Sequence, residues 1–418
     1  MSFFTRGPAF GLALAAVAAI GIAGAQSQPH SAIGPKPHSL FLDKNSFMNQ
    51  PNSFYYFHNM DKLGFKQDWV RHAGPVFALQ EPTQPFSVQY TYRGGTYTLD
   101  QYLARNYTTG FMVLHDNQIL YERYLHGSTR SSRFLSNSMA KSITSTLVGC
   151  AIDDGKIASV NDKIVTYLPY LQASAGYRDV TIKQLLEMAT GVNFDENYLD
   201  PKANVYLLTN ALVWGSPSFK DLAISMGRKR QPGTVFEYQS INTQVLGLLV
   251  EKVTGEPLNQ YLQEKIWQKI GAESDGFLYR SPKQADQCAF GCYNATLRDY
   301  ARFSLMAMYG GRLDGRRVVS QAWMKEATTP GAKFLAPIPN GPHDAANQGY
   351  AYQWWIPYGR DGAFMAMGVY GQILYINPAR HVVVVQTSAW PQPDTDARWD
   401  ESQRMMDTIA SKFPVVKP

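Results

Sequence analysis

The stretch that decides the fold is "FLSNSMAKSITSTLVGCAIDDGKI", residues 134–157. Its apolar residues recur at helical spacing, and we expect a helix that begins near Asn137, a good capping residue, and ends at Asp153-Asp154-Gly155. Ser138 and Lys141 fall on one polar stripe of this helix, together with further small hydroxyl residues. No acidic residue lies within one helical turn of Lys141. The stretch therefore raises the question of what this lysine does.

The spacing of Ser138 and Lys141 suggests nucleophilic chemistry. Ser138 lies in the first turn, where backbone N–H groups are unpaired and negative charge is favoured. A free lysine has a pKa of about 10.4, but burial between two lobes would lower this pKa. A neutral Lys141 could then take the proton of Ser138 for attack on a carbonyl carbon. The motif alone leaves the alternative open, which is a solvated lysine on a helix face.

Two further segments carry groups that such a reaction needs. "GTVFEYQSINTQVLGLLVEKVTG", residues 233–255, places Tyr238 and Ser240 just before a long helical pattern. A nearby lysine ammonium would lower the pKa of Tyr238, which could then relay protons; the alternative is a half-buried tyrosine at a helix start. "FMAMGVYGQILYINPARHVVVV", residues 364–385, is a glycine-containing strand pattern. A backbone N–H there, with that of Ser138, would form an oxyanion hole.

The distribution of strand and helix patterns predicts an α+β fold. "GFMVLHDNQILYERYL", residues 110–125, indicates a β-hairpin, and strand patterns return only near the C-terminus. We expect an antiparallel sheet of early and late strands flanked by the first and last helices, with a mostly helical second lobe at about residues 160–330. Residues 109–418 form this domain, and residues 26–108 are expected to be an extended N-terminal segment that packs on it without a motif of its own.

Composition and the N-terminus limit the classes of protein. The 418 residues are 45% hydrophobic and 17% charged, which suits a large globular core, and the net charge of +6 without a basic cluster argues against nucleic acid as a partner. Residues 1–25 have the layout of a secretory signal with cleavage after Ala25. We therefore expect a periplasmic or secreted protein with no stable membrane anchor after cleavage. The alternative, an uncleaved anchor, would use an apolar run at the short end for a bilayer span.

The three cysteines are compatible with two states. Cys288 and Cys292 are close enough in sequence to form a disulfide in an exported protein, or they are buried thiols, as Cys150 is expected to be. Histidines at ligand spacing are absent from their surroundings, so we expect neither a metal site nor a cofactor.

The order of these motifs resembles the serine β-lactamase and penicillin-binding-protein superfamily, in particular its class C-like branch. Within that branch the chain is most similar to 6-aminohexanoate-dimer hydrolases, over roughly residues 105–415 and through "SMAKS", "FEYQS", "NATLRDYARF" and "GVYGQILYINPAR". The resemblance implies a β-lactamase-like fold. It also implies the following site: Ser138 as nucleophile, Lys141 as base, Tyr238 as proton relay, the N–H groups of Ser138 and Val369 as oxyanion hole, and Tyr198 (in "FDENYLDP"), Ser240 and Gly368 as substrate-binding residues.

The chain also departs from β-lactamases. Ser240 stands where their second motif has Asn. Ala366-Met367-Gly368 stands where they have Lys-Thr-Gly, so this chain lacks the lysine that in β-lactamases engages the carboxylate of the β-lactam antibiotic. We therefore expect an exported serine hydrolase that cleaves amides or esters of small acyl compounds through an acyl-enzyme. The alternatives are a β-lactamase or D-amino-acid peptidase, and a non-catalytic sensor on the same fold.

Overall fold

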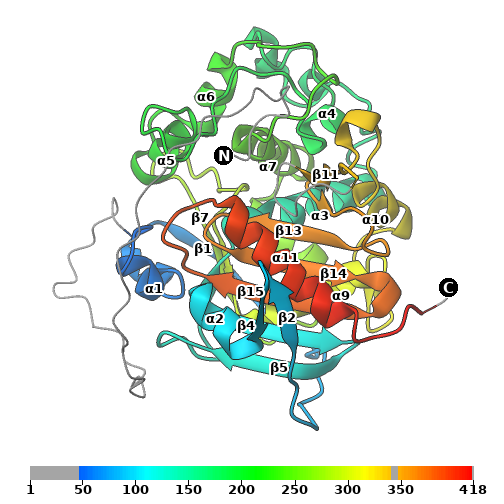
Figure 1. The fold of residues 1–418 in the computed structure, drawn as a ribbon. Coiled ribbons are helices and arrows are strands. Elements are labelled where there is room, and N and C mark those ends of the chain that lie inside the picture. Colours follow the sequence, from blue (N-terminus) through cyan, green and yellow to red (C-terminus); the bar gives the residue numbers. More distant parts are fainter. Residues whose placement is uncertain (1–46, 340–346, 417–418) are drawn as a thin grey trace.

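The computed structural model describes residues 47–339 and 347–416. Among these residues the main sheet has seven antiparallel strands in the order β11-β12-β13-β14-β15-β4-β5 (Figure 1). The strands are β4 (Thr108–His115), β5 (Gln118–Tyr124), β11 (Gly349–Tyr350), β12 (Trp355–Ile356), β13 (Phe364–Gly368), β14 (Gln372–Asn377) and β15 (Val382–Ser388). The early strand β4 pairs with the late strand β15, so the prediction of a sheet built from both ends of the chain is confirmed.

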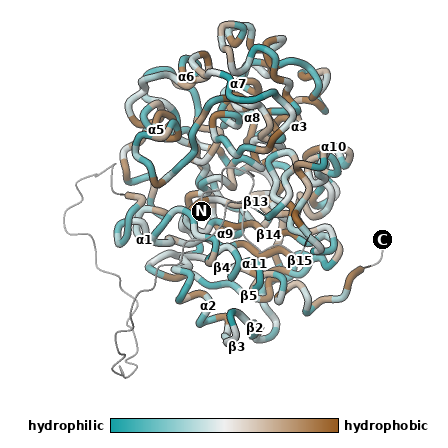
Figure 2. The backbone as a smooth tube through the Cα atoms, turned by 45° about the horizontal axis from the view of Figure 1, so that its top comes forward, coloured by the Kyte–Doolittle hydropathy of each residue, from teal (hydrophilic) through white to brown (hydrophobic). Residues whose placement is uncertain are grey.

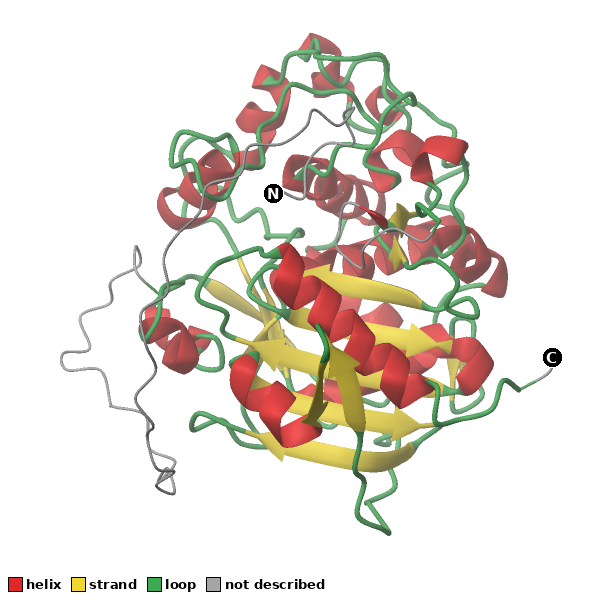
Figure 3. Cartoon of the chain, in the orientation of Figure 1, coloured by secondary structure: helices red, strands yellow, loops and turns green. Residues whose placement is uncertain are grey.

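Helices cover both faces of this sheet, and alternate residues of each strand contact different helices. On β4, Phe111 and Val113 belong to the core beneath α2 and α11, whereas Met112 and Leu114 belong to the core shared with α3 and α9. Figure 3 shows α11 lying across the near face of the sheet. These helices are α2 (Leu99–Arg105), α3 (Ala140–Asp153), α9 (Leu297–Met308) and α11 (Asp396–Ala410). Figure 2 shows hydrophobic stretches along the central strands β14 and β15, as expected for strands buried on both faces.

The second lobe is mostly helical, as the sequence predicts. It contains α4 (Ile182–Leu186), α5 (Val205–Trp214), α6 (Phe219–Ser225), α7 (Ser240–Thr254), α8 (Leu258–Leu262) with a following π-turn (Gln263–Trp267), and α10 (Gln321–Ala327). Helix α7 packs against α3 and α4, which brings the second lobe onto the helix of the opening stretch. Helix α5 was not predicted from the sequence, because "VYLLTNALVW" is too uniformly apolar to show a clear helical face.

The N-terminal segment is more regular than predicted. It contains α1 (Asn52–Tyr56), β1 (Gln67–Val70), the hairpin β2 (Gln89–Tyr92) and β3 (Gly95–Thr98), and helix α2, which Thr98 and Gln101 begin with a capping box. Strand β1 pairs with β7 (Gly276–Tyr279) at the edge of a second sheet completed by β8 (Tyr293–Ala295) and β6 (Phe134–Leu135). The segment does pack on the main body, but the expectation of a purely extended lead-in is wrong.

The prediction of a signal peptide cleaved after Ala25 lies outside the described residues. Within residues 47–339 and 347–416, no helix combines the length and the apolar character that a bilayer span requires.

Candidate active site

Ser138 lies in a tight turn that leads directly into α3. Residues Asn137–Met139 form a 3-10 turn, and Ser138 is 8% exposed. The prediction that Asn137 caps the helix is wrong, because Asn137 adopts a left-handed backbone conformation (φ 41°) and caps nothing. Its side-chain amide instead donates to the carbonyl oxygen of Val369, 2.9 Å away. This bond ties the serine turn to the chain that follows β13.

Lys141 is buried one turn along α3. Its Nζ lies 2.8 Å from Ser138 Oγ and donates a second hydrogen bond of 2.8 Å to the carbonyl oxygen of Phe290. Burial lowers the pKa of Lys141 from 10.5 to about 7, and the neighbouring Glu196 carboxylate acts in the opposite direction. Lys141 is only 1% exposed, so the alternative of a solvated lysine on a helix face is wrong. At neutral pH a substantial fraction of this amine is therefore uncharged.

Glu196 is a buried carboxylate of the site that was not predicted from the sequence. Its two oxygens accept hydrogen bonds from the backbone N–H of Ser240 (2.8 Å), the hydroxyl of Ser240 and the hydroxyl of Tyr198 (2.7 Å). Burial holds the pKa of Glu196 above its usual value, and the Lys141 ammonium and these hydrogen bonds oppose this shift only in part. Glu196 lies in the same "FDENYLDP" segment as Tyr198. The resemblance of this segment to a substrate-binding loop was therefore the one feature of the sequence that could have indicated Glu196.

Tyr238 lies beside both Ser138 and Lys141, as a proton relay requires, but its pKa is raised and not lowered. Its ring stacks on Trp355, and Lys141 Nζ lies 5.0 Å from the ring centroid. Burial raises the pKa of Tyr238 well above 10, and a hydrogen bond with Ser138 only partly opposes this. The predicted lowering of its pKa is therefore wrong, because desolvation of the phenolate, with the nearby Glu196 carboxylate, outweighs the hydrogen bond with Ser138. At neutral pH the side chain is a neutral phenol.

The strand β13 ends directly against the serine turn. A Cβ atom at Gly368 would lie 2.6 Å from the carbonyl oxygen of Ser136 and 2.8 Å from the backbone nitrogen of Ser138. Only glycine permits this approach. Val369 follows it and lines the same cavity as Ser138. Ser240 is the first residue of α7, and both its N–H and its hydroxyl donate hydrogen bonds to the Glu196 carboxylate.

Ser138 opens into an apolar cavity of about 720 Å³, including its mouth to solvent. Among the described residues that line it, none is Lys, Arg, His, Asp or Glu. The N-terminal segment supplies an unexpected part of the wall, namely Phe47, Met48, Met60 and Phe65. Tyr198 also lines the cavity, with its hydroxyl donating to Glu196.

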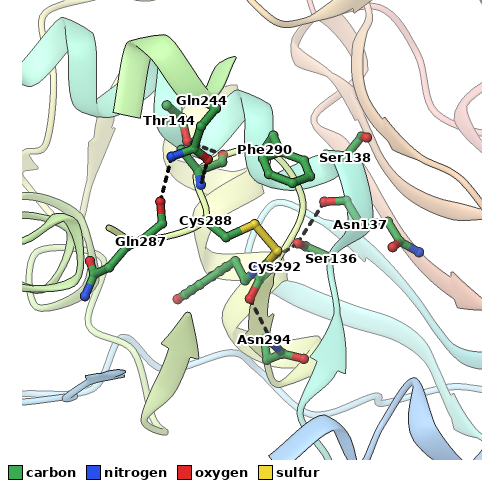
Figure 4. The surroundings of a disulfide bond; sticks show 12 residues. Ser136, Asn137, Ser138, Thr144, Gln244, Gln287, Cys288, Phe290, Cys292 and Asn294 are labelled. Atoms are coloured by element: carbon green, nitrogen blue, oxygen red, sulfur yellow. Dashed lines mark hydrogen bonds between the residues drawn. A yellow bond between two sulfur atoms is a disulfide. The ribbon is translucent and has the colours of Figure 1, made fainter. Parts of the chain in front are cut away.

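Cys288 and Cys292 form a disulfide, with Cα atoms 5.7 Å apart, whereas Cys150 is a buried free thiol. Of the two states left open by the sequence, the disulfide is confirmed. Figure 4 shows the disulfide loop, with Phe290 projecting beside Ser138. Within the described ranges, no group of three or more His, Cys, Asp or Glu side chains could hold a metal ion.

Comparison with known proteins assigns the chain to a family. The sequence profile of the family described as Beta-lactamase matches residues 98–404. The chain belongs to the beta-lactamase family. Among curated relatives, this beta-lactamase-family chain is 32% identical over 313 residues to a 6-aminohexanoate-dimer hydrolase of Paenarthrobacter ureafaciens, covering 71% of this chain and 76% of the relative.

Solved structures give the same assignment of fold. A structure described as "Putative 6-aminohexanoate-dimer hydrolase from Bacillus anthracis" is 26% identical, with a TM-score of 0.77 over 91% of this chain and all of the other. A family VIII carboxylesterase, 18% identical, has a TM-score of 0.56 over 75% of this chain and 96% of its own, and shows likeness of fold alone. The predicted α+β, β-lactamase-like fold is thus confirmed. The protein is a serine hydrolase of this fold, related to 6-aminohexanoate-dimer hydrolases.

Proposed function

We propose that this protein is an exported serine hydrolase that cleaves amide or ester bonds of small, uncharged acyl compounds through an acyl-enzyme on Ser138. One observation carries the proposal: the buried amine of Lys141, with its pKa lowered to about 7, lies 2.8 Å from the Ser138 hydroxyl oxygen. A neutral amine at this distance can accept the hydroxyl proton at neutral pH.

In the acylation step, the proton of Ser138 moves to Lys141 Nζ while Ser138 Oγ bonds to the substrate's carbonyl carbon. The carbonyl oxygen becomes an oxyanion, which the backbone N–H groups of Ser138 and Val369 would stabilise. The close packing of Gly368 on the Ser138 nitrogen supports this role, because it brings the two backbone segments together at the cavity.

The tetrahedral intermediate collapses when the bond to the leaving group breaks and that group takes a proton. Tyr238 is the donor: its phenol remains protonated at rest, lies beside Ser138, and can regain its proton from the Lys141 ammonium. In deacylation the transfers run in reverse. A water gives its proton to the Tyr238–Lys141 pair, its oxygen bonds to the acyl carbon, and Ser138 is released with its proton.

The cavity supports an uncharged substrate. Its described lining carries no cation for a carboxylate, in agreement with Ala366-Met367-Gly368 at the position of Lys-Thr-Gly. Binding a free carboxylate there would bury an unpaired charge, which is strongly unfavourable. This argues against efficient hydrolysis of β-lactams or D-alanyl peptides, which carry such a group. Apolar acyl chains gain from burial against the walls of the cavity.

Export is proposed from the N-terminal sequence and supported by the Cys288–Cys292 disulfide, since such bonds persist in oxidising compartments. N-terminal sequencing of the exported protein should give Gln26 as the first residue; a protein that retains Met1 contradicts cleavage.

A substrate panel with adduct mapping tests the activity. The panel comprises linear amides, p-nitrophenyl esters, β-lactams and D-alanyl peptides. We expect turnover of uncharged esters and amides, a fluorophosphonate adduct on Ser138, and no turnover by Ser138→Ala. The matched control is Ser142→Ala: Ser142 lies on α3 beside Lys141, and its hydroxyl donates to the carbonyl oxygen of Gln353 and should not react. Preferred turnover of β-lactams or D-alanyl peptides would contradict the substrate class, and labelling without turnover of any substrate would indicate a sensor.

A further inference from the structure

The disulfide loop Cys288–Cys292 lies directly against the catalytic helix. The loop, "CAFGC", joins the segment after β7 to β8, and Cys292, Phe290 and Gly291 line the cavity of Ser138. Figure 4 shows the disulfide and the Phe290 ring beside the segment that contains Ser136, Asn137 and Ser138. None of the steps of the proposed reaction uses the disulfide itself.

Hydrogen bonds connect this loop to both helices of the site. The carbonyl oxygen of Phe290 accepts from Lys141 Nζ (2.8 Å), and the carbonyl oxygen of Ala289 accepts from Thr144 Oγ1 (2.7 Å), both on α3. The Ala289 N–H donates to Gln244 Oε1 on α7 (3.0 Å). These bonds align the loop with α3 and α7 when the disulfide is formed, and the bond from Lys141 joins the Phe290 carbonyl to the amine.

The position of the Phe290 carbonyl determines how Lys141 can act. A neutral lysine amine has two N–H groups and one lone pair, and the lone pair must point at the Ser138 hydroxyl to accept its proton. Since the Phe290 carbonyl accepts one N–H, rotation of the amine is restricted and the lone pair has fewer orientations available. Of the ionisable side chains near Lys141, the Glu196 carboxylate acts on its charge and the Tyr238 ring lies beside its Nζ.

We propose that the Cys288–Cys292 disulfide is a positioning element of the active site, which holds the Phe290 carbonyl where it orients the Lys141 amine toward Ser138. Without the crosslink, Gly291 gives the loop backbone freedom beside the serine turn. The nearest atoms that a Cβ at Gly291 would meet are backbone atoms of Asn137, at 3.6–3.9 Å, so the glycine lies next to the serine turn without a close contact there. The inference rests on the proposed function, because it assigns a role in the deprotonation of Ser138.

The test compares the oxidised enzyme with the double variant Cys288→Ser/Cys292→Ser. The control is Cys150→Ala, which removes a buried thiol remote from Ser138. Active-site titration with a fluorophosphonate counts the competent sites, and p-nitrophenyl ester hydrolysis gives kcat and KM per site across pH. We expect kcat per site to fall by about tenfold or more, as a misplaced base does, with KM within about twofold and an altered acid limb of the pH profile. The control should keep both parameters.

A second measurement applies even if the double variant folds poorly. Dithiothreitol reduces the native disulfide by supplying two electrons and two protons, giving two thiols and its own cyclic disulfide. We expect reversible loss of rate that follows the number of alkylatable thiols, and no such loss in the double variant. An unchanged kcat per titrated site and an unchanged pH profile, in the variant or after verified reduction, would overturn the inference. Turnover by Ser138→Ala would instead overturn the proposed function, so the two failures are distinguishable.

Discussion

Replacing Gly368 by alanine is the sharpest geometric test of the oxyanion site. The added Cβ would lie 2.6 Å from the Ser136 carbonyl oxygen and 2.8 Å from the Ser138 nitrogen. Both neighbours are backbone atoms, so neither can turn away as a side chain would. An ordinary contact begins at 3.4 Å, so the end of β13 and the serine turn must separate by about 0.8 Å.

This separation predicts the size of the effect. Catalytic groups must hold their geometry within about 0.5 Å, and a misplacement of about 1 Å can reduce the rate by about 10²-fold. We therefore expect Gly368→Ala to lower kcat by about 10²-fold, which corresponds to about 2.7 kcal/mol of transition-state stabilisation. KM should change little, because the apolar walls of the cavity remain. Overpacking should also destabilise the fold by about 1–3 kcal/mol.

The assay is p-nitrophenyl ester hydrolysis per fluorophosphonate-titrated site, with thermal unfolding to establish that the variant is folded. Gly227→Ala is the matched control, since its Cβ would meet nothing closer than 4.0 Å. If Gly368→Ala keeps kcat within about threefold of the parent while Gly227→Ala does the same, the backbone of β13 does not form part of the oxyanion site.

Three further substitutions test the side chains around Ser138. Glu196→Gln removes the carboxylate that raises the pKa of Lys141, so the acid limb of kcat/KM should move to lower pH; an unmoved limb would mean that Glu196 carries no charge in the active form. Tyr198→Phe should reduce amide turnover more than ester turnover, because amide cleavage depends more on hydrogen bonding to the leaving nitrogen; equal losses count against its role. Tyr238→Phe should lower amide kcat by about 10²–10⁴-fold and p-nitrophenyl ester kcat by less, because p-nitrophenolate leaves without a proton. Equal sensitivity of both substrates would contradict proton donation by Tyr238.

Local patterns in the sequence were sufficient for much of the fold. The sequence patterns predicted the helices α3 and α7, and the pattern of residues 110–125 predicted the β4–β5 hairpin, in which His115 pairs with Gln118. These elements depend on residues close together in the chain. That early and late strands share one sheet followed from a general rule about packing layers, and the structure adds the specific pairing of β4 with β15.

The site was only partly predictable, because its missing members depend on tertiary packing. Nothing in the sequence around Lys141 points to Glu196, which the fold of a separate loop brings to it. Asn137 is a residue type that often caps helices. In this fold, however, its side-chain amide donates to the carbonyl oxygen of Val369, which is distant in the sequence. The raised pKa of Tyr238 follows from burial that no local pattern reveals.

The N-terminal segment shows the same limitation. Its composition, rich in Pro, Asn and aromatic residues, favours loops, but Phe47 and Met48 line the cavity of Ser138. Their role depends on where the segment packs.

The measurement that tests the central claim most directly is the pH dependence of Ser138 phosphonylation by a fluorophosphonate. If Lys141 deprotonates Ser138, the second-order rate constant should rise with pH with a midpoint near 7, the lowered pKa of Lys141. In Lys141→Met, which keeps an apolar side chain in the buried position, that rise should disappear and the rate at neutral pH should fall by about 10²–10⁴-fold. A Lys141→Met variant that is phosphonylated at the parental rate with the same midpoint would contradict the account.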